Sequence, residues 1–448
     1  MAPRCRSMAA CLAALPVAGA LGVQALRDRE VVLGHSLVPV HPGAQGMMES
    51  VTQLDATMRK SGIRADGPLT GTPLMATQIM FVSSPTSQKV VYTELRDFKS
   101  TSGVTYPLVD SGLAEPCGLA VDRRRGDLYV ADRGQKMIFR YTLLAHQAQD
   151  GSYQLQTDGT RVTVVENRSV EWIALDQNGT LFFTDSSKNS VNKVTKEVLD
   201  RLLVGDYTAE DLQVVPEIDL AASSRTNASG KATEVFTAKP RILSMYDGSV
   251  NTQVSSPSGV VADGPRLFWA NGANGKKAGT LVQGQATPWV PSSLATKGLA
   301  GDFPTAKVAD SADQAYGIAK TNTLLFFTGK SSSTGKDSVF GVDQYGGPVF
   351  NVAPGLSKPR GLAWDGDNTM YVADEGKNHV WSMPAGRLVA SAPVSKVVEF
   401  SGAYGVALIS RGDPGFTLMT GASAFTAVLA PALQLMLVAL TAAGLRAA

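Results

Sequence analysis

The chain has 448 residues, with 41 lysines and arginines against 39 aspartates and glutamates, and its formal net charge at pH 7 is +2. This near balance argues against a nucleic-acid-binding protein, because such proteins concentrate positive charge on one face. A hydrophobic fraction of 44% in a chain of this length provides enough apolar surface for a large globular core.

Residues 1–25 have the features of a secretory signal peptide. Arg4 and Arg6 form a short basic start, residues 8–23 are predominantly apolar, and the small residues around Ala25 offer a cleavage site. We therefore expect the protein to enter the secretory pathway and to lose this segment. A retained N-terminal anchor is the alternative.

Cysteine usage is consistent with that processing but predicts no disulfide. Cys5 and Cys11 belong to the predicted signal peptide. Cys117 is then left without a partner in the same chain, even though the compartment would permit a disulfide.

Residues 26–73 form a polar, glycine-containing extension ahead of the first predicted strand. Within it, Met47, Val51, Leu54 and Met58 are spaced as on one face of a helix. We interpret the extension as a short helix packed on the main domain or as a loose linker.

A short pattern recurs six times after residue 115 and predicts a repeat protein. In the first copy, Gly-Leu-Ala-Val-Asp at residues 118–122 is followed by Leu-Tyr-Val-Ala-Asp at residues 128–132. We call the first residue of each copy its anchor. The spacings between anchors are 54, 87, 58, 44 and 44 residues, and the shortest match the period of about 40–45 residues of a four-stranded propeller blade. The anchors are Gly118, Trp172, Gly259, Gly317, Gly361 and Gly405.

The sixth copy lacks a second strand, and the start of the domain supplies one. Residues 78–82, 89–93 and 104–109 have the composition of second, third and fourth strands that lack a first. If residues 404–409 provide that first strand, residues 74–410 close as an all-β, six-bladed β-propeller of antiparallel sheets. The N- and C-terminal strands then share a blade, and closure leaves no sheet edge open to aggregation.

The longest interval between anchors contains an insertion at about residues 195–240. Its first part, residues 196–203, has a helical pattern, and the remainder is polar. Long insertions in repeat proteins gather on one face and often carry binding, so the insertion is a candidate binding element.

Export would make the glycosylation sequons meaningful. Asn167, Asn178 and Asn227 each begin an Asn-x-Ser/Thr sequence, and the last two fall in an expected turn or in the insertion. We predict these three asparagines as candidate glycosylation sites.

The repeats resemble those of the NHL family, whose strands have the forms Pro-x-Gly-Ile-Ala-Val-Asp and Ile-Tyr-Val-Ala-Asp. Residues 116–132 and 359–374 match these forms best, and the resemblance covers residues 74–410. The chain is also similar to other six-bladed propellers, namely YWTD-repeat modules and the gluconolactonase and strictosidine-synthase enzymes. The matching residues build blades, so the resemblance implies the fold and leaves the chemistry open.

The sequence contains no motif typical of a metal centre or an activated nucleophile, such as His-Glu-x-x-His, Cys-x-x-Cys or Gly-x-Ser-x-Gly. With only four histidines, the chain lacks the ligands of the histidine-based zinc lyases known among NHL-like propellers. The aspartates that end the strands, such as Asp132 and Asp374, recur in register and are interpreted as turn residues. We predict no metal and no cofactor; calcium is implied only if the chain is a lactonase of the gluconolactonase type.

The residues just before the anchors are the candidate ligand-binding site. They should lie at the mouth of the central channel, where six first strands converge, and Glu171 should face Arg360 because blades three apart are opposite each other. This mixture of charge and aromatic rings suits a small polar ligand or a peptide side chain. The alternative is a plug of polar residues in which Glu171 and Arg360 are held by local partners. The candidates are Cys117, Glu171, Ser258, Tyr316, Arg360 and Tyr404.

Residues 414–445 contain no charged side chain, a run of 32 that is long enough to cross a bilayer. One interpretation is a transmembrane helix that leaves the propeller outside the cytoplasm, at the cell surface or in an endomembrane lumen. The other is a glycolipid-anchor signal. We favour the helix, because a cleavage near residue 401 would remove the strand that closes the ring.

Two classes of function follow. The favoured one is a non-enzymatic, membrane-anchored binding module that recognises a protein or a small polar ligand through the channel mouth or the face loops, as the resemblance to NHL and YWTD modules implies. The alternative is a metal-dependent lactonase or hydrolase of the gluconolactonase-like type. Glu171 would coordinate a cation together with Asn or Asp ligands in the second case only.

Overall fold

The computed structural model describes residues 78–96, 99–100, 103–148, 152–216, 241–287, 303–332 and 334–416. The chain divides into two compact units, Met1–Thr72 and Pro73–Ala448, and all described residues belong to the second. The predicted signal peptide, the whole N-terminal extension, Asn227 and all but the first three residues of the predicted membrane tail lie outside the described residues. Among the helices that the described residues form, none combines the length and apolar composition needed to cross a bilayer.

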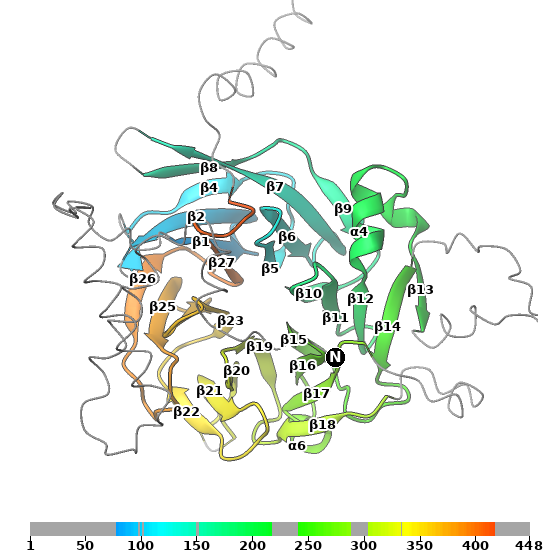
Figure 1. Cartoon of the computed structure of the whole chain (residues 1–448). Coiled ribbons are helices and arrows are strands. Elements are labelled where there is room, and N and C mark those ends of the chain that lie inside the picture. Colours follow the sequence, from blue (N-terminus) through cyan, green and yellow to red (C-terminus); the bar gives the residue numbers. More distant parts are fainter. Residues whose placement is uncertain are drawn as a thin grey trace, which may run out of the picture. The chain divides into compact units, whose positions relative to one another are not determined.

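Six sheets surround a central axis and form a six-bladed propeller (Figure 1). We number the blades in chain order, starting with the blade that contains the first described strand. Blade 1 has the order β27-β1-β2, with β3 and β4 both paired to β2. Its strands are β27 (Val406–Ser410), β1 (Gln78–Ser84), β2 (Lys89–Arg96), β3 (Lys99–Ser100) and β4 (Tyr106–Val109).

Blades 2 and 3 each carry an additional strand. Blade 2 contains β5 (Pro116–Asp122), β6 (Asp127–Asp132), β7 (Met137–Gln147), β8 (Tyr153–Thr157) and β9 (Val162–Val165). Blade 3 contains β10 (Val170–Leu175), β11 (Leu181–Asp185), β12 (Ser190–Val194), β14 (Arg241–Asp247) and β13 (Gln213–Pro216). Between β12 and β13 lie the helix α4 (Lys196–Leu203) and the short 3₁₀ helix η1 (Ala209–Asp211).

Blades 4 to 6 are plain four-stranded sheets. Blade 4 contains β15 (Pro257–Asp263), β16 (Arg266–Asn271), β17 (Leu281–Gln285) and β18 (Ala306–Ala309), with the helical turn α6 (Gly275–Ala278) after β16. Blade 5 contains β19 (Ala315–Lys320), β20 (Leu324–Lys330), β21 (Asp337–Asp343) and β22 (Phe350–Ala353). Blade 6 contains β23 (Pro359–Trp364), β24 (Thr369–Asp374), β25 (His379–Pro384) and β26 (Ser395–Glu399).

The predicted ring closure is confirmed. The strand β27 pairs antiparallel with β1 from Gln78↔Ser410 to Val82↔Val406, so strands from the two ends of the domain lie side by side. The helical pattern at residues 196–203 is also confirmed as α4. The expectation of purely antiparallel sheets is wrong in one place, because β13 pairs parallel with β14 within the insertion.

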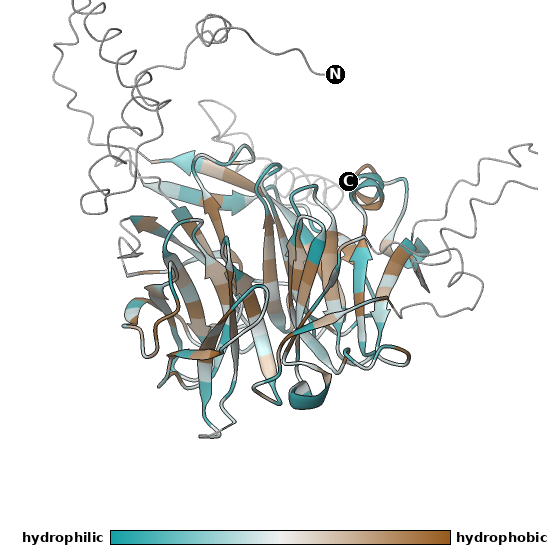
Figure 2. Cartoon of the chain, turned by 60° about the horizontal axis from the view of Figure 1, so that its bottom comes forward, coloured by the Kyte–Doolittle hydropathy of each residue, from teal (hydrophilic) through white to brown (hydrophobic). Residues whose placement is uncertain are grey.

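The second strand of every blade is buried on both faces, which explains its continuous apolar sequence. Neighbouring side chains on such a strand point to opposite sides, so Tyr129 packs toward blade 3 and Val130 toward blade 1. In the same way Phe182 packs toward blade 4 and Phe183 toward blade 2. The result is one hydrophobic cluster between each pair of neighbouring blades. Figure 2 shows the corresponding pattern, with hydrophobic residues in the strands and hydrophilic residues in many turns.

The aspartates at the strand ends have the structural role that the sequence predicted. The carboxylate of Asp132 accepts hydrogen bonds from the backbone N–H groups of Ala114, Glu115 and Gln135 at 2.7–3.0 Å. Asp374 binds the corresponding N–H groups in blade 6. These aspartates therefore tie the turns together within blades 2 and 6.

The two faces of the propeller differ in what they carry. We call the face where the inner strands begin the mouth face and the face where they end the tail face. Since strands alternate in direction, the third-to-fourth-strand connections start on the tail face, and they include the described part of the insertion, residues 195–216, and the β7–β8 hairpin. The segment after β27, residues 411–416, lies there too, because Gly415 donates to the carbonyl of Arg123 in the β5–β6 turn at 2.8 Å.

Candidate functional site

The anchor glycines bring the six inner strands together at the mouth face. A Cβ atom added to Gly118, Gly259, Gly317, Gly361 or Gly405 would lie within 3.0 Å of the carbonyl oxygen that precedes the anchor of the next blade. For example, the distance is 2.7 Å from Gly118 to Glu171 and 2.6 Å from Gly361 to Tyr404. Glycine is needed at these positions because any side chain would collide with backbone.

Trp172 is the exception among the anchors, and its ring helps to close the mouth. The ring stacks on that of Tyr404 from blade 1, with centroids 5.5 Å apart and planes at 26°. Cys117 completes a buried cluster with these two rings, and Tyr316 packs against it. We call this cluster the plug.

Below the plug the channel is narrow. A cavity of about 40 Å³ is lined by inner-strand residues of all six blades, such as Leu119, Ile318 and Val406. This space holds little more than water. A ligand at the mouth would therefore rest on the plug instead of entering the channel.

Glu171 lies at the edge of the plug and has two partners. Its Oε1 atom accepts a hydrogen bond from the hydroxyl of Tyr404 and lies 3.1 Å from Nη1 of Arg133. Arg133 also binds Glu115 at 3.0 Å, so one guanidinium bridges two carboxylates. The side chain of Glu171 remains 25% exposed, which leaves part of the carboxylate in reach of solvent.

Arg360 lies across the ring from Glu171 and is held by its own blade. Its Nε atom lies 2.9 Å from Oε2 of Glu375, and the guanidinium lies 4.5 Å from the ring centroid of Tyr316 and 5.7 Å from that of Tyr404. Glu171 was predicted to lie opposite Arg360. Each of the two forms an ion pair with a nearby residue, Glu171 with Arg133 and Arg360 with Glu375. The nearby aromatic rings add cation–π attraction that favours this position of the guanidinium.

Burial keeps the hydroxyl and thiol groups of the plug protonated. It raises the pKa of Tyr404 well above its ordinary value, and the negative charge of Glu171 adds to the effect. Burial and the same carboxylate raise the pKa of the Cys117 thiol. Cys117 is thus a buried thiol, and its Sγ atom donates to the carbonyl of Glu115 at 3.3 Å instead of serving as a nucleophile.

The six candidate residues divide into two groups. Glu171, Tyr316 and Arg360 are partly exposed at the mouth. Cys117, Ser258 and Tyr404 are buried. The Ser258 hydroxyl donates to the carbonyl of Ala315 at 2.7 Å, so it links two blades and does not face the mouth.

The residues that pair with Glu171 and Arg360 were not predicted from the sequence. Arg133 and Glu375 both follow the aspartate that ends the second strand, Asp132 and Asp374. That shared position is the signal that could have identified them, since the turn after the second strand reaches the same face as the start of the inner strand.

The arrangement does not fit a calcium site. In the part of the chain that the structure describes, no group of three or more His, Cys, Asp or Glu side chains is placed to hold a metal ion. The carboxylates of Glu115 and Glu171 converge on the guanidinium of Arg133, whereas calcium takes six to eight oxygen ligands.

Two of the three predicted glycosylation sites can be located. Asn167 is exposed between β9 and β10 on the mouth face, and Asn178 is exposed between β10 and β11 on the tail face. Their modification stays a prediction.

Comparison with known proteins gives no family. No protein-family model and no curated protein matches the chain. Among solved structures, the chain is similar to the nidogen–laminin complex, with 16% identity, a TM-score of 0.46 and coverage of 74% of this chain and 98% of that one.

Two enzyme propellers give similar values. A candidate 6-phosphogluconolactonase from Bacteroides uniformis has 10% identity and a TM-score of 0.44, with coverage of 75% of this chain and 100% of that one. An inactive virginiamycin B lyase from Staphylococcus aureus, with quinupristin, has 14% identity and a TM-score of 0.37, with coverage of 76% and 94%. Likenesses this distant say nothing about activity, so the site must be interpreted from its own geometry.

Proposed function

We propose that this propeller is a non-enzymatic binding module whose ligand, a protein side chain or a small polar molecule, docks at the channel mouth. The observation that supports it most is the arrangement of the mouth. A glutamate and an arginine lie on opposite sides of an aromatic floor formed by Trp172 and Tyr404. Each charge is held in place by a local partner and remains partly exposed.

Such a mouth is preorganised. Trp172, Glu171 and Arg360 stand at the start of inner strands, whose backbones are fixed by the close packing at the anchor glycines. Ligand binding then requires little ordering of side chains, which lowers its entropic cost. Because acid and base are both present, we expect a ligand with both a hydrogen-bond donor and an acceptor.

We further propose that the protein works in the secretory pathway as an NHL-like module tethered by its C-terminal tail. The apolar sequence of residues 414–445 supports the tether, and the position of residues 411–416 on the tail face supports an orientation. Asp413 pairs with Arg123 in the β5–β6 turn at 3.8 Å. A chain that continues from this face into a membrane would present the mouth away from the bilayer.

The binding proposal is tested with the purified full-length chain and a panel of the 20 N-acetyl amino-acid amides, measured by ligand-observed NMR. We expect charged or polar members to bind, and we expect Glu171→Gln and Arg360→Gln each to weaken that binding at least tenfold. Glu197→Gln, in the exposed first turn of α4 on the tail face, serves as the matched control. Equal binding by all three variants would contradict the mouth as the site.

Metal analysis of the same preparation tests the class of function. We expect no stoichiometric calcium or zinc after dialysis. Tight one-to-one binding of either ion would overturn the non-enzymatic proposal.

The membrane tether is tested by treating membranes with a phosphatidylinositol-specific phospholipase. Release of the protein would contradict the transmembrane helix and would support a glycolipid anchor.

A further inference from the structure

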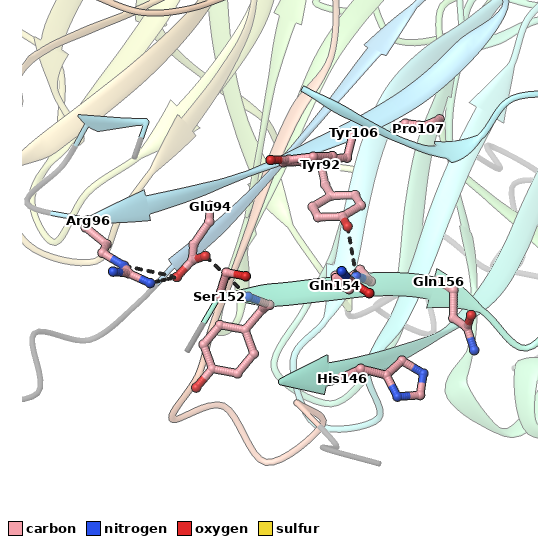
Figure 3. A pocket seen from close by; sticks show the side chains of 11 residues that line it. Tyr92, Glu94, Arg96, Tyr106, Pro107, His146, Ser152, Gln154 and Gln156 are labelled. Carbon is pink, nitrogen blue, oxygen red and sulfur yellow. Dashed lines mark hydrogen bonds and ion pairs between the residues drawn. The ribbon is translucent and has the colours of Figure 1, made fainter. Parts of the chain in front are cut away.

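A second cavity lies far from the mouth, between the outer strands of blade 1 and the β7–β8 hairpin (Figure 3). Its volume is about 620 Å³, within the range of about 300–1,000 Å³ that is usual for small-molecule sites. We call it the hairpin groove. Its lining includes Tyr92, Arg96, Tyr106, His146, Gln154 and Gln156.

The groove exists because β7 continues beyond its blade. Residues Asp127 to Asp132 of β6 pair with the first half of β7, and β8 pairs with the second half, from Leu143↔Thr157 to Gln147↔Tyr153. The hairpin thus reaches along blade 1, and Figure 3 shows the side chains of Tyr92 and Glu94 extending from β2 toward β8.

A peptide strand is a poor fit to this groove. The outer edge of β8 is already engaged, since the Leu155 N–H donates to the hydroxyl of Tyr92 at 3.0 Å and the Tyr153 N–H donates to Glu94 at 3.3 Å. Strand addition needs those N–H groups, so the hairpin is protected against it.

A strongly charged ligand is also a poor fit. The carboxylate of Glu94, only 7% exposed, is bound through Oε1 by both Nε and Nη2 of Arg96, at 3.2 and 3.1 Å. The acid and the base of the groove therefore neutralise each other, and an ionic ligand would have to displace one of them.

The remaining lining combines an aromatic surface with planar polar groups. Tyr106 is 45% exposed, and its ring lies 5.5 Å from that of Tyr92. Gln154 and Gln156 present amides, each with a donor and an acceptor, and His146 presents an imidazole. A sugar ring has a C–H face that stacks on an aromatic ring and a rim of hydroxyls that both donate and accept hydrogen bonds.

From these features we infer that the hairpin groove binds a neutral carbohydrate. The sugar stacks on Tyr106, and its hydroxyls are bound by the amides and the imidazole along β7 and β8. This site is separate from the mouth, so its occupancy does not depend on the function proposed there. The ligand is a free oligosaccharide or a glycan attached to another protein.

The test uses the full-length chain with maltotriose, cellotriose, N,N′,N″-triacetylchitotriose and a heparin-derived tetrasaccharide, measured by saturation-transfer NMR. We expect at least one neutral trisaccharide to bind and the anionic one to bind more weakly. A high-mannose glycoprotein, before and after enzymatic removal of its glycans, distinguishes attached from free sugar.

Matched variants locate the site. Tyr106→Ala and Gln154→Ala should each weaken sugar binding roughly tenfold, the amount expected for a lost aromatic or hydrogen-bonding contact, while Tyr106→Phe should retain it. Tyr345→Ala removes a tyrosine that is 80% exposed on blade 5 and should have no effect. Glu171→Gln at the mouth should have none either.

Four results would overturn the inference, and the first three are no binding of any neutral sugar, tighter binding of the heparin fragment than of the neutral ones, and equal loss in Tyr106→Ala and Tyr345→Ala. Loss of sugar binding in Glu171→Gln alone would move the site to the mouth and would also overturn it.

Discussion

The mouth face and the tail face are built from the same six repeats, but the blades differ from one another in different ways on the two faces. On the mouth face the anchor glycines pack against neighbouring backbone, so at the described starts of the inner strands the blades differ in single side chains. On the tail face the third-to-fourth-strand connections include the longest ones and carry extra elements such as α4 and β8.

This difference indicates two kinds of binding surface. The mouth presents a few side chains on a rigid backbone. One difference between blades, Trp172 in place of an anchor glycine, supplies the ring that stacks on Tyr404. The tail face instead carries added elements, and a hairpin such as β7–β8 forms a groove against the neighbouring blade without disturbing the ring. Substitutions on the two faces should therefore have different costs.

The largest expected effect is on the plug. Trp172→Ala removes a ring that is 7% exposed and stacked on Tyr404, and large-to-small changes of this kind cost about 3–5 kcal/mol. Trp364, at the tail-face end of β23, is only partly buried, so Trp364→Ala should cost less. Chemical denaturation of both variants measures the difference, and equal costs would mean that the plug has no special role.

The next effect is on the inner ring. In Gly405→Ala the new Cβ would approach the carbonyl of Cys117 and the hydroxyl of Ser83, a clash of the overpacking type that costs about 2–3 kcal/mol. Gly412→Ala, on the tail face, meets no atom within 4 Å and should change the free energy of unfolding by less than about 0.5 kcal/mol. Similar midpoints for the two variants in urea would refute this explanation of the anchors.

A smaller effect is expected from the hydroxyl of Tyr404. Tyr404→Phe removes its hydrogen bond to Glu171, and a bond to a charged acceptor contributes about 1.5–3 kcal/mol. Because burial raises the pKa of Tyr404, the loss should be the same at pH 7 and pH 9. Tyr316→Phe is the control, since its exposed hydroxyl lies 3.3 Å from Gln314 and should contribute little. A loss that disappears at pH 9 would show an ionised hydroxyl.

The smallest effect belongs to the tail face. Desolvation opposes ionisation of Asp200, but hydrogen bonds from Lys196 and Arg125 prevail and lower its pKa. The carboxylate therefore stabilises the fold above its unfolded pKa of about 4, and that stability is lost as pH falls through the lower folded value. Because the side chain is 35% exposed, solvent screening leaves only a few tenths of a kcal/mol. The gap between wild type and Asp200→Asn should shrink from pH 6 to pH 2.

Much of the ring could be predicted from the sequence because its cause is local. The buried second strands need apolar runs, aspartate ends the second strands of blades 2, 3 and 6, and five of the six inner strands carry an anchor glycine, so each requirement leaves a residue at a fixed offset. Ring closure was also predictable, since a strand pattern without a partner at residue 405 matched a blade without an inner strand at residue 78.

The hairpin groove and the details of the mouth could not be predicted in this way. The backbone N–H groups at the edge of β8 donate to the side chains of Tyr92 and Glu94, about 60 residues away in the sequence, and no local sequence pattern predicts such a contact. At the mouth, the six positions were predictable, but the direction of the Ser258 hydroxyl depends on which carbonyl is nearer. Arg133 comes from a neighbouring blade and reaches Glu171 only in three dimensions.

The pairing of β27 with β1 has a consequence for folding during synthesis. A ribosome adds about 5–20 residues per second, and β1 leaves the exit tunnel more than 300 residues before the strand that completes its sheet. Throughout that interval one side of β1 is an unsatisfied template for foreign strands. We therefore expect the nascent chain to depend on chaperones until its last inner strand emerges.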